Sequence, residues 1–147
     1  MISSINDFQK VFFIGVAGTG MSAIAQYLQG IGKNVSGSDR YFIDKEYNET
    51  KEKLEATGIQ CFLQDGTGIN TDTDLIVVST AVEDTVMEIQ KAKQLNIPII
   101  KRSELLALIA NSKRTIAVSG TSGKSTTSAM LFDILEYANM KPSIISG

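Results

Sequence analysis

Short apolar runs alternate with longer amphipathic stretches along the chain, and this alternation is the strongest constraint on the fold. Each run has the length of a β-strand, and in each stretch that follows, apolar residues recur at helical spacing. From the runs we predict strands at residues 11–16, 33–39, 59–63, 73–80, 97–100, 114–120 and 141–147. From the stretches we predict helices at residues 21–31, 43–54, 89–95, 103–109 and about 126–138.

Strands and helices in strict alternation predict a parallel sheet with helices on both faces. The strands are continuous apolar runs, which indicates that the sheet is buried on both faces. We therefore expect an α/β fold with a Rossmann-like parallel sheet.

Composition and charge exclude several classes of function. The net charge of −2 comes without a basic block, so nucleic acid is not expected as a partner. No apolar run approaches the ~20 residues of a membrane helix, and the first residues lack the pattern of a signal peptide, so no membrane insertion is expected. The single cysteine, Cys61, suits a reducing compartment, and we expect a cytoplasmic protein in which this thiol is an unreactive core residue. The sequence has no histidine, which excludes His-based catalytic triads and most zinc sites.

The first glycine-rich loop lies between the strand at 11–16 and its helix. In the GxGxxG register of dinucleotide-binding loops it reads Gly15, Ala17, Gly20, and an extra glycine stands at Gly18. Such a turn presents backbone N–H groups and a helix N-terminus to an anion. Asp39 ends the second predicted strand about 20 residues later, where an acidic group can accept a hydrogen bond from a ribose hydroxyl.

Two further hydroxyls are expected beside this loop. Ser79 and Thr80 follow the fourth predicted strand and would lie at the carboxyl edge of the sheet, where open parallel sheets bind ligands. NAD and a nucleotide-sugar diphosphate are both compatible with these residues. A glycine turn that only packs strand against helix, with a plain polar turn beside it, is the structural alternative.

The second glycine-rich loop reads GTSGKS and spans residues 120–125. It is a compressed form of the GxxxxGK[ST] phosphate loop, because Val118 stands five residues before Gly123 where that pattern has glycine. Its backbone N–H groups would face phosphates, with Lys124 as a point charge and Ser125 as a hydroxyl for Mg²⁺. We expect a strand, this P-loop, a helix and a further strand as one unit.

Two phosphate loops about a hundred residues apart, the second in this compressed form, resemble the Mur ligases. The motifs that carry the resemblance cover nearly the whole chain in the family's order: FIGVAGTGMSAIA, VSGSD, LIVVSTAV, IPIIKRSELLALI, IAVSGTSGKSTTSAML and KPSIISG. The most similar branch adds L-alanine or a peptide. The resemblance implies that residues 1–111 are a Rossmann-like UDP-sugar-binding domain and that residues 112–147 are the truncated start of a central ATP-binding domain.

The resemblance also implies roles for individual residues. A UDP-sugar site would comprise Gly15, Gly18, Thr19, Gly20, Met21, Ser38, Asp39, Ser79, Thr80 and Ala81. An ATP site would comprise Gly120, Thr121, Ser122, Gly123, Lys124, Ser125 and Thr126. Within the ATP site, Lys124 would be the catalytic residue and Ser125 a ligand of Mg²⁺.

The reaction that the resemblance implies is the ATP-dependent formation of an amide bond in peptidoglycan synthesis. ATP converts a carboxylate of UDP-N-acetylmuramic acid into an acyl phosphate, which an amine then attacks. The chain would be an N-terminal fragment that binds UDP-N-acetylmuramic acid. ATP, Mg²⁺ and an amino-acid or peptide acceptor would act in the full-length enzyme, and the fragment alone would form no peptide bond.

One segment and three single positions depart from the family's pattern. After Val82 the chain reads EDTVMEI, where the family tends to have an Asn-Pro-Glu sequence. Ser122 stands where members of this branch usually have histidine, Ser125 where they have threonine, and Ala17 where they have glycine. Ser125 keeps a hydroxyl for the metal, whereas Ser122 supplies no imidazole.

Other functions compete with this interpretation. An NAD-binding domain of a dehydrogenase or sensor would explain residues 1–111 and leave the second loop unused. A P-loop binding module would leave the first loop unused. A pseudo-ligase domain that serves as a partner surface would use neither.

Overall fold

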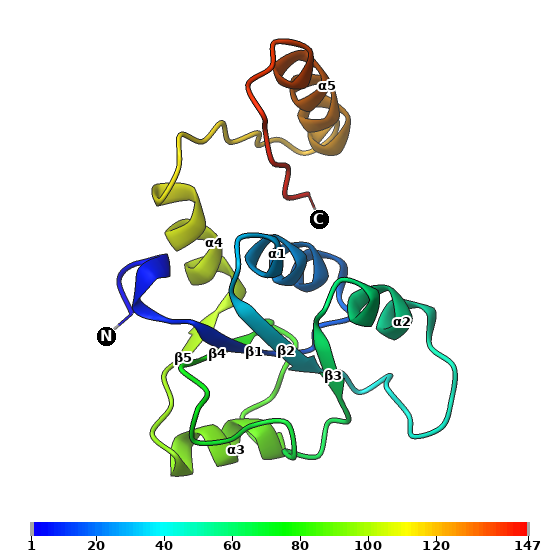
Figure 1. Ribbon diagram of the computed structural model, residues 1–147, viewed down its shortest axis with the longest axis vertical. Helices are drawn as coiled ribbons and strands as arrows, with labels where there is room; N and C mark the ends of the chain where they lie inside the picture. Colours follow the sequence, from blue (N-terminus) through cyan, green and yellow to red (C-terminus); the bar gives the residue numbers. More distant parts are fainter. Residues whose placement is uncertain (1, 147) are drawn as a thin grey trace.

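A computed structural model describes residues 2–146, and its centre is a five-stranded parallel sheet (Figure 1). The strand order is β3-β2-β1-β4-β5, with every neighbouring pair parallel. The strands are β1 (Lys10–Ile14), β2 (Asn34–Ser38), β3 (Gln60–Phe62), β4 (Leu75–Val78) and β5 (Ile99–Lys101). From β1 the chain adds β2 and β3 on one side and then β4 and β5 on the other, so the strand order reverses between β1 and β4, as in Rossmann-like folds. This topology confirms the predicted α/β class.

Strand β1 lies at the middle of the sheet because its sequence, KVFFI, is apolar on both faces. Its residues alternate between two hydrophobic clusters. Val11 and Phe13 face the first cluster, whereas Phe12 and Ile14 face the second. All four side chains are at most 1% exposed, so this strand is buried on both sides.

Helices cover both faces of the sheet, as predicted (Figure 1). Helices α1 (Thr19–Gly30), α2 (Glu49–Ala56) and α4 (Arg102–Asn111) lie on one face and α3 (Met87–Gln94) lies on the other. A short 3₁₀ helix, η1 (Ile5–Asp7), precedes β1. Within the described residues 2–146, no helix is both long enough and apolar enough to cross a membrane.

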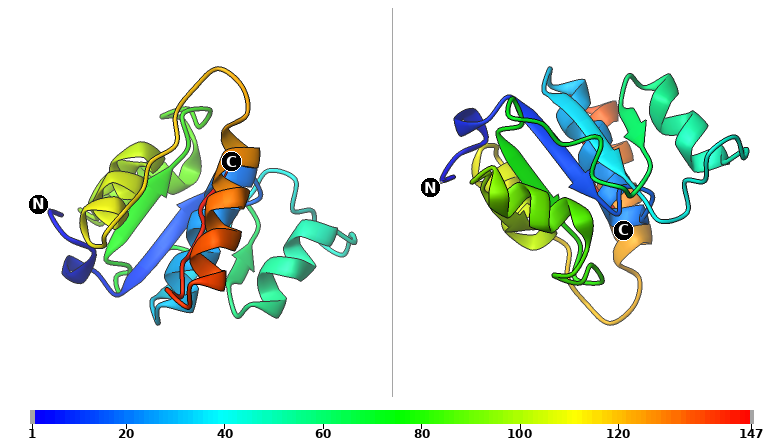
Figure 2. Two further views of the ribbon diagram at one scale, coloured as in Figure 1. Left: turned by 90° about the horizontal axis from the view of Figure 1, so that it is seen from above. Right: turned by 90° about the horizontal axis from the view of Figure 1, so that it is seen from below.

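The last part of the described chain differs from the prediction. The predicted helix is present as α5 (Lys124–Tyr137), but the predicted strands at 114–120 and 141–147 are absent from residues 114–120 and 141–146. Gly147 lies outside the described residues. A strand needs a hydrogen-bonded partner, and these two segments have none in the part of the chain that the structure describes. Figure 2 shows that α5 lies on the same side of the sheet as α1, opposite α3.

Candidate functional site

The loops after β1, β2, β4 and β5 meet at the carboxyl edge of the sheet. In an open parallel sheet this is the edge where ligands bind, at the point where the strand order reverses. Here the reversal lies between β1 and β4. The first glycine-rich loop, at residues 15–20, follows β1 and therefore lies at this reversal.

The turn at Gly15 is shaped by the end of the neighbouring strand. Gly15 has a φ of +85°, a left-handed conformation that favours glycine. The amides of Gly15 and Val16 donate to the Ser38 carbonyl oxygen at 2.8 and 3.0 Å. The Ser38 hydroxyl is fully buried and has no hydrogen-bond partner within residues 2–146. The backbone carbonyl of Ser38, and not its side chain, thus fixes the glycine loop.

Asp39 holds the same loop through its carboxylate. One oxygen, Oδ2, accepts a hydrogen bond from the Ala17 amide at 2.9 Å, and Oδ1 accepts one from the Tyr41 amide at 3.1 Å. The residue is 5% exposed. Both oxygens therefore bond to the protein's own backbone, and the carboxylate fixes the conformation of the loop.

Two amides at the start of α1 are open to a ligand. Gly18 is the N-cap of α1 and provides no side chain, and its carbonyl oxygen accepts from Met21 at 2.9 Å. The Met21 side chain is buried in the core, so Met21 offers neither a free amide nor a surface group. The amides of Thr19 and Gly20 make no hydrogen bond within the described residues. The first turn of α1 contains no acidic residue, so its positive end is not compensated by a side chain of its own.

The loop after β4 borders this helix end, as the sequence predicts. A Cβ atom at Gly15 would lie 3.6 Å from the Ser79 hydroxyl oxygen. Ser79 is half-buried, and Thr80 and Ala81 are exposed beyond it. The structure therefore brings the predicted Ser79 hydroxyl beside the first glycine loop.

Arg102 also reaches this edge, although the sequence analysis assigned it no role. It is the first residue of α4, directly after β5. Its guanidinium lies against the Cα of Gly20, so that a Cβ atom there would overlap Nη1 and lie 3.1 Å from Cζ. The position of Arg102 at the carboxyl end of a predicted strand was the signal that could have identified it.

The second glycine-rich loop is exposed and leads directly into α5. Gly123, with a φ of +74°, is the N-cap of this helix. The backbone amides of residues 121–126 make no hydrogen bond among the described residues. The Lys124 ammonium donates to the Gly120 carbonyl oxygen at 2.8 Å, and the Ser146 and Ser125 hydroxyls lie 3.4 Å apart. The loop therefore combines free amides, a cation and a hydroxyl, which is the donor set that a polyphosphate requires.

The described residues contain no group of three or more Asp, Glu, Cys or His side chains that could hold a metal ion. A magnesium ion at the second loop would have Ser125 as its ligand from this loop and would need phosphate oxygens to complete its shell. Burial raises the pKa of the Cys61 thiol to about 12, with the nearby Glu55 carboxylate as a second cause, in agreement with an unreactive cysteine.

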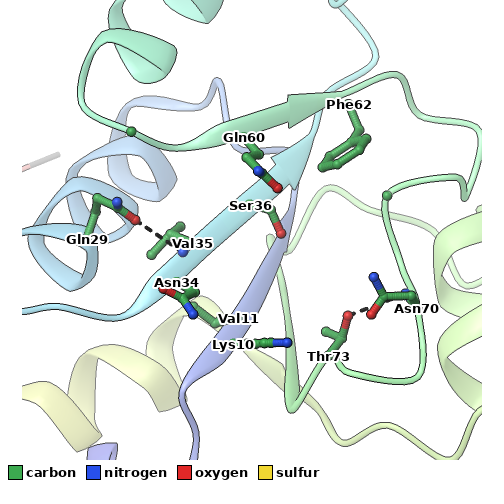
Figure 3. Close-up of a pocket in the computed structure, with 12 residues that line it drawn as sticks. Lys10, Val11, Gln29, Asn34, Val35, Ser36, Gln60, Phe62, Asn70 and Thr73 are labelled. Atoms are coloured by element: carbon green, nitrogen blue, oxygen red, sulfur yellow. Dashed lines mark hydrogen bonds between the residues drawn. The ribbon is translucent and has the colours of Figure 1, made fainter.

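A cavity of about 300 Å³ lies away from both loops (Figure 3). It is formed by the amino-terminal parts of β1 and β2, by β3 and by the loop that carries Asn70 and Thr73. In Figure 3, Lys10, Asn34 and Gln60 line it. None of the predicted site residues lines it.

Comparison with known proteins gives consistent matches. The family model described as "Mur ligase family, catalytic domain" matches residues 10–114. The UDP-N-acetylmuramate–L-alanine ligase of Buchnera aphidicola is 39% identical over 146 residues, which are 99% of this chain and 29% of that protein. The corresponding ligase of Carboxydothermus hydrogenoformans is 46% identical over 138 residues, which are 93% of this chain and 29% of that protein.

Solved structures agree with the sequence matches. The crystal structure of UDP-N-acetylmuramate–alanine ligase from Thermotoga maritima aligns with a TM-score of 0.75 and 32% identity, over 88% of this chain and 30% of that one. A UDP-N-acetylmuramate:L-alanyl-γ-D-glutamyl-meso-diaminopimelate ligase from Neisseria meningitidis aligns with a TM-score of 0.79 and 28% identity, over 95% of this chain and 43% of that one. The chain spans about 29% of the length of the curated relatives it matches.

The family model covers the sheet and helices α1–α4, and the alignment with the Buchnera ligase extends through the second glycine-rich loop. The first glycine-rich loop lies at the edge of a Rossmann-like sheet, and the second lies at the start of α5. The chain belongs to the Mur ligase family.

Proposed function

We propose that the chain binds UDP-N-acetylmuramic acid at its first glycine loop and carries the ATP phosphate loop of an amide-forming ligase of peptidoglycan synthesis. In this proposal residues 1–111 are the UDP-sugar-binding domain and residues 112–147 begin the ATP-binding domain. The observation that carries the proposal is the pair of free amides, Thr19 and Gly20, at the start of α1 in a chain of this family. A cytoplasmic location is part of the proposal, because its ligands are ATP and a UDP-sugar.

The first loop suits a diphosphate for a simple electrostatic reason. A helix N-terminus carries a partial positive charge and directs its unpaired amides at an anion. We place the diphosphate at residues 18–20, beside Ser79 and Thr80. Ser38 and Asp39 support the site by fixing the loop backbone, since their carbonyl and carboxylate oxygens accept its amides.

The second loop suits the phosphates of ATP. When bound, ATP supplies the phosphoryl group that activates a carboxylate. Lys124 would exchange its contact with the Gly120 carbonyl for a phosphate oxygen, where its charge is better neutralised. The Ser125 hydroxyl would become one magnesium ligand. The chain spans about 29% of its relatives' length. We therefore propose amide formation only for a protein that joins these residues to the remaining parts of a ligase.

A charge placed at the N-cap tests the first site. Gly18 is exposed and has a φ of −63°, and an added Cβ atom would make only ordinary contacts, with the nearest atom at 3.5 Å. Aspartate is a preferred N-cap residue, so Gly18→Asp is expected to fold at least as stably as the wild type. Its carboxylate would occupy the amides and repel a diphosphate. We expect the affinity for UDP-N-acetylmuramic acid, measured by titration calorimetry, to fall at least about tenfold.

Gly18→Ala is the matched control, because it adds the Cβ atom without the charge. We expect this variant to bind within a few-fold of the wild type. Wild-type chain that is folded and yet gives no heat with UDP-N-acetylmuramic acid, but binds NAD, would overturn the proposal. Equal binding by the Asp and Ala variants would show that the ligand does not bind at the α1 N-terminus.

A further inference from the structure

The guanidinium of Arg102 and the N-terminus of α1 lie together without a negative charge between them. Arg102 starts α4, and its side chain reaches Gly20 in α1. Within residues 2–146 it forms no ion pair and donates no hydrogen bond. The nearest acid on its own helix, Glu104, accepts from the Lys101 amide at 2.6 Å instead.

An anion would stabilise this arrangement. The positive end of a helix repels a cation, and here the amides of Thr19 and Gly20 are free on the same surface that the guanidinium covers. An anion held between the amides and the guanidinium would satisfy both groups. A guanidinium also offers a planar pair of donors that matches two phosphate oxygens.

The close approach leaves no room for a side chain at residue 20 while the guanidinium keeps this position. Any side chain there would occupy the place of the Arg102 guanidinium, because even a Cβ atom would overlap Nη1. Gly20 has an ordinary helical conformation, so its backbone does not require glycine.

We propose that Arg102 is a diphosphate-binding residue of the nucleotide-sugar site, contacting the ligand beside the α1 amides. This inference rests on the proposed function, since it assigns a residue to that same site. Arg102 belongs to the last helix before the linker to the second loop, so ligand binding would connect α4 with α1. The role requires both charge and planar geometry, and it therefore predicts different results for alanine and lysine at this position.

The test compares Arg102→Ala, Arg102→Lys and the wild-type chain by titration calorimetry with UDP-N-acetylmuramic acid. Arg102 is exposed, so all variants are expected to fold, which thermal unfolding will verify. We expect Arg102→Ala to weaken binding about tenfold or more and Arg102→Lys to recover part of that loss. Arg114→Ala is the matched control, because it removes one exposed arginine outside the site, and it should bind within twofold.

Uridine, titrated at millimolar concentration by NMR, separates phosphate binding from a general effect on the loop. It lacks the diphosphate, so Arg102→Ala should leave its affinity unchanged. If wild-type chain binds UDP-N-acetylmuramic acid and Arg102→Ala binds it equally well, the role of Arg102 is wrong while the proposed function stands. An equal loss for uridine would also overturn this role, because Arg102 would then act through loop structure. Absence of wild-type binding would defeat the proposed function itself.

Discussion

At the residue scale, the Asp39 carboxylate accepts the Ala17 and Tyr41 amides, and the residue is 5% exposed. Removing the carboxylate would leave two amides without their acceptor in a mostly buried place. We predict that Asp39→Ala lowers the free energy of unfolding by about 2 kcal/mol, because an unsatisfied buried donor costs about 1–3 kcal/mol. Urea unfolding followed by circular dichroism measures this change.

Asp44→Ala is the control for this experiment. Asp44 is exposed, and its 4.0 Å approach to the Lys45 ammonium is a surface ion pair. Its removal should change stability by less than about 0.5 kcal/mol. If Asp39→Ala is as stable as the wild type but binds UDP-N-acetylmuramic acid poorly, the carboxylate contacts the ligand rather than the loop.

For the first loop, the sequence predicts which residue types occur but not which atoms they contact. Gly15 follows from the glycine pattern because a left-handed turn favours that residue type. The sequence places Asp39 beside the loop, but it does not reveal that each carboxylate oxygen accepts a backbone amide. Arg102 received no role, because its contact with Gly20 depends on the order of strands in the sheet. That order is a tertiary property and does not follow from periodicity.

At the element scale, Asp74 ties the start of β1 to the start of β4. Its Oδ2 accepts the Gln9 and Lys10 amides at 2.8 Å each, and its own amide donates to the Lys10 carbonyl oxygen at 2.9 Å. The hydrogen bond from the Lys10 amide, followed by that from Gln9, lowers the pKa of Asp74. We predict that Asp74→Asn destabilises the fold by about 1 kcal/mol at pH 7, a small value because solvent screens this exposed group.

The lowered pKa gives this prediction a pH dependence. Above about pH 4 the carboxylate is ionised in both folded and unfolded chains, so its contribution is fully present. Below that pH the unfolded chain binds the proton first, and the contribution is lost as pH falls through the folded pKa. The stability difference between wild type and Asp74→Asn should therefore shrink between pH 4 and pH 2, measured by urea unfolding. Asp72→Asn, which alters only an exposed pair with Lys10, should show a smaller difference at pH 7.

The elements of the sheet were predictable because their signals are local. Five apolar runs became strands, with ends that differ from the prediction by up to two residues. The runs at 114–120 and 141–147 carry the same signal, yet residues 114–120 and 141–146 form no strand. A strand needs an adjacent strand to bond its amides, and periodicity reports burial tendency rather than the presence of a partner. Helix α5 formed because its backbone hydrogen bonds are internal.

At the scale of the whole molecule, the described chain has two parts with different burial. The sheet and helices α1–α4 contain the two hydrophobic clusters, whereas no residue of α5 is buried. Met130 and Ile134 of α5 are 60% and 61% exposed, and Tyr137 is 92% exposed. An isolated helix of 14 residues is marginally stable in water, so α5 depends on contacts that are few in this structure.

This difference predicts unequal protection of backbone amides. By hydrogen exchange with mass spectrometry, α5 should exchange at least about a hundredfold faster than β1 and β4, because protection follows the burial of the surrounding element. Helix α4 is the internal control, since it is shorter but buries Leu105 and Ile109 in the core. We expect α4 to be protected and α5 to be open. Equal protection of α4 and α5 would contradict the prediction and would mean that α5 is covered in solution, by the sheet domain or by a second copy of the chain.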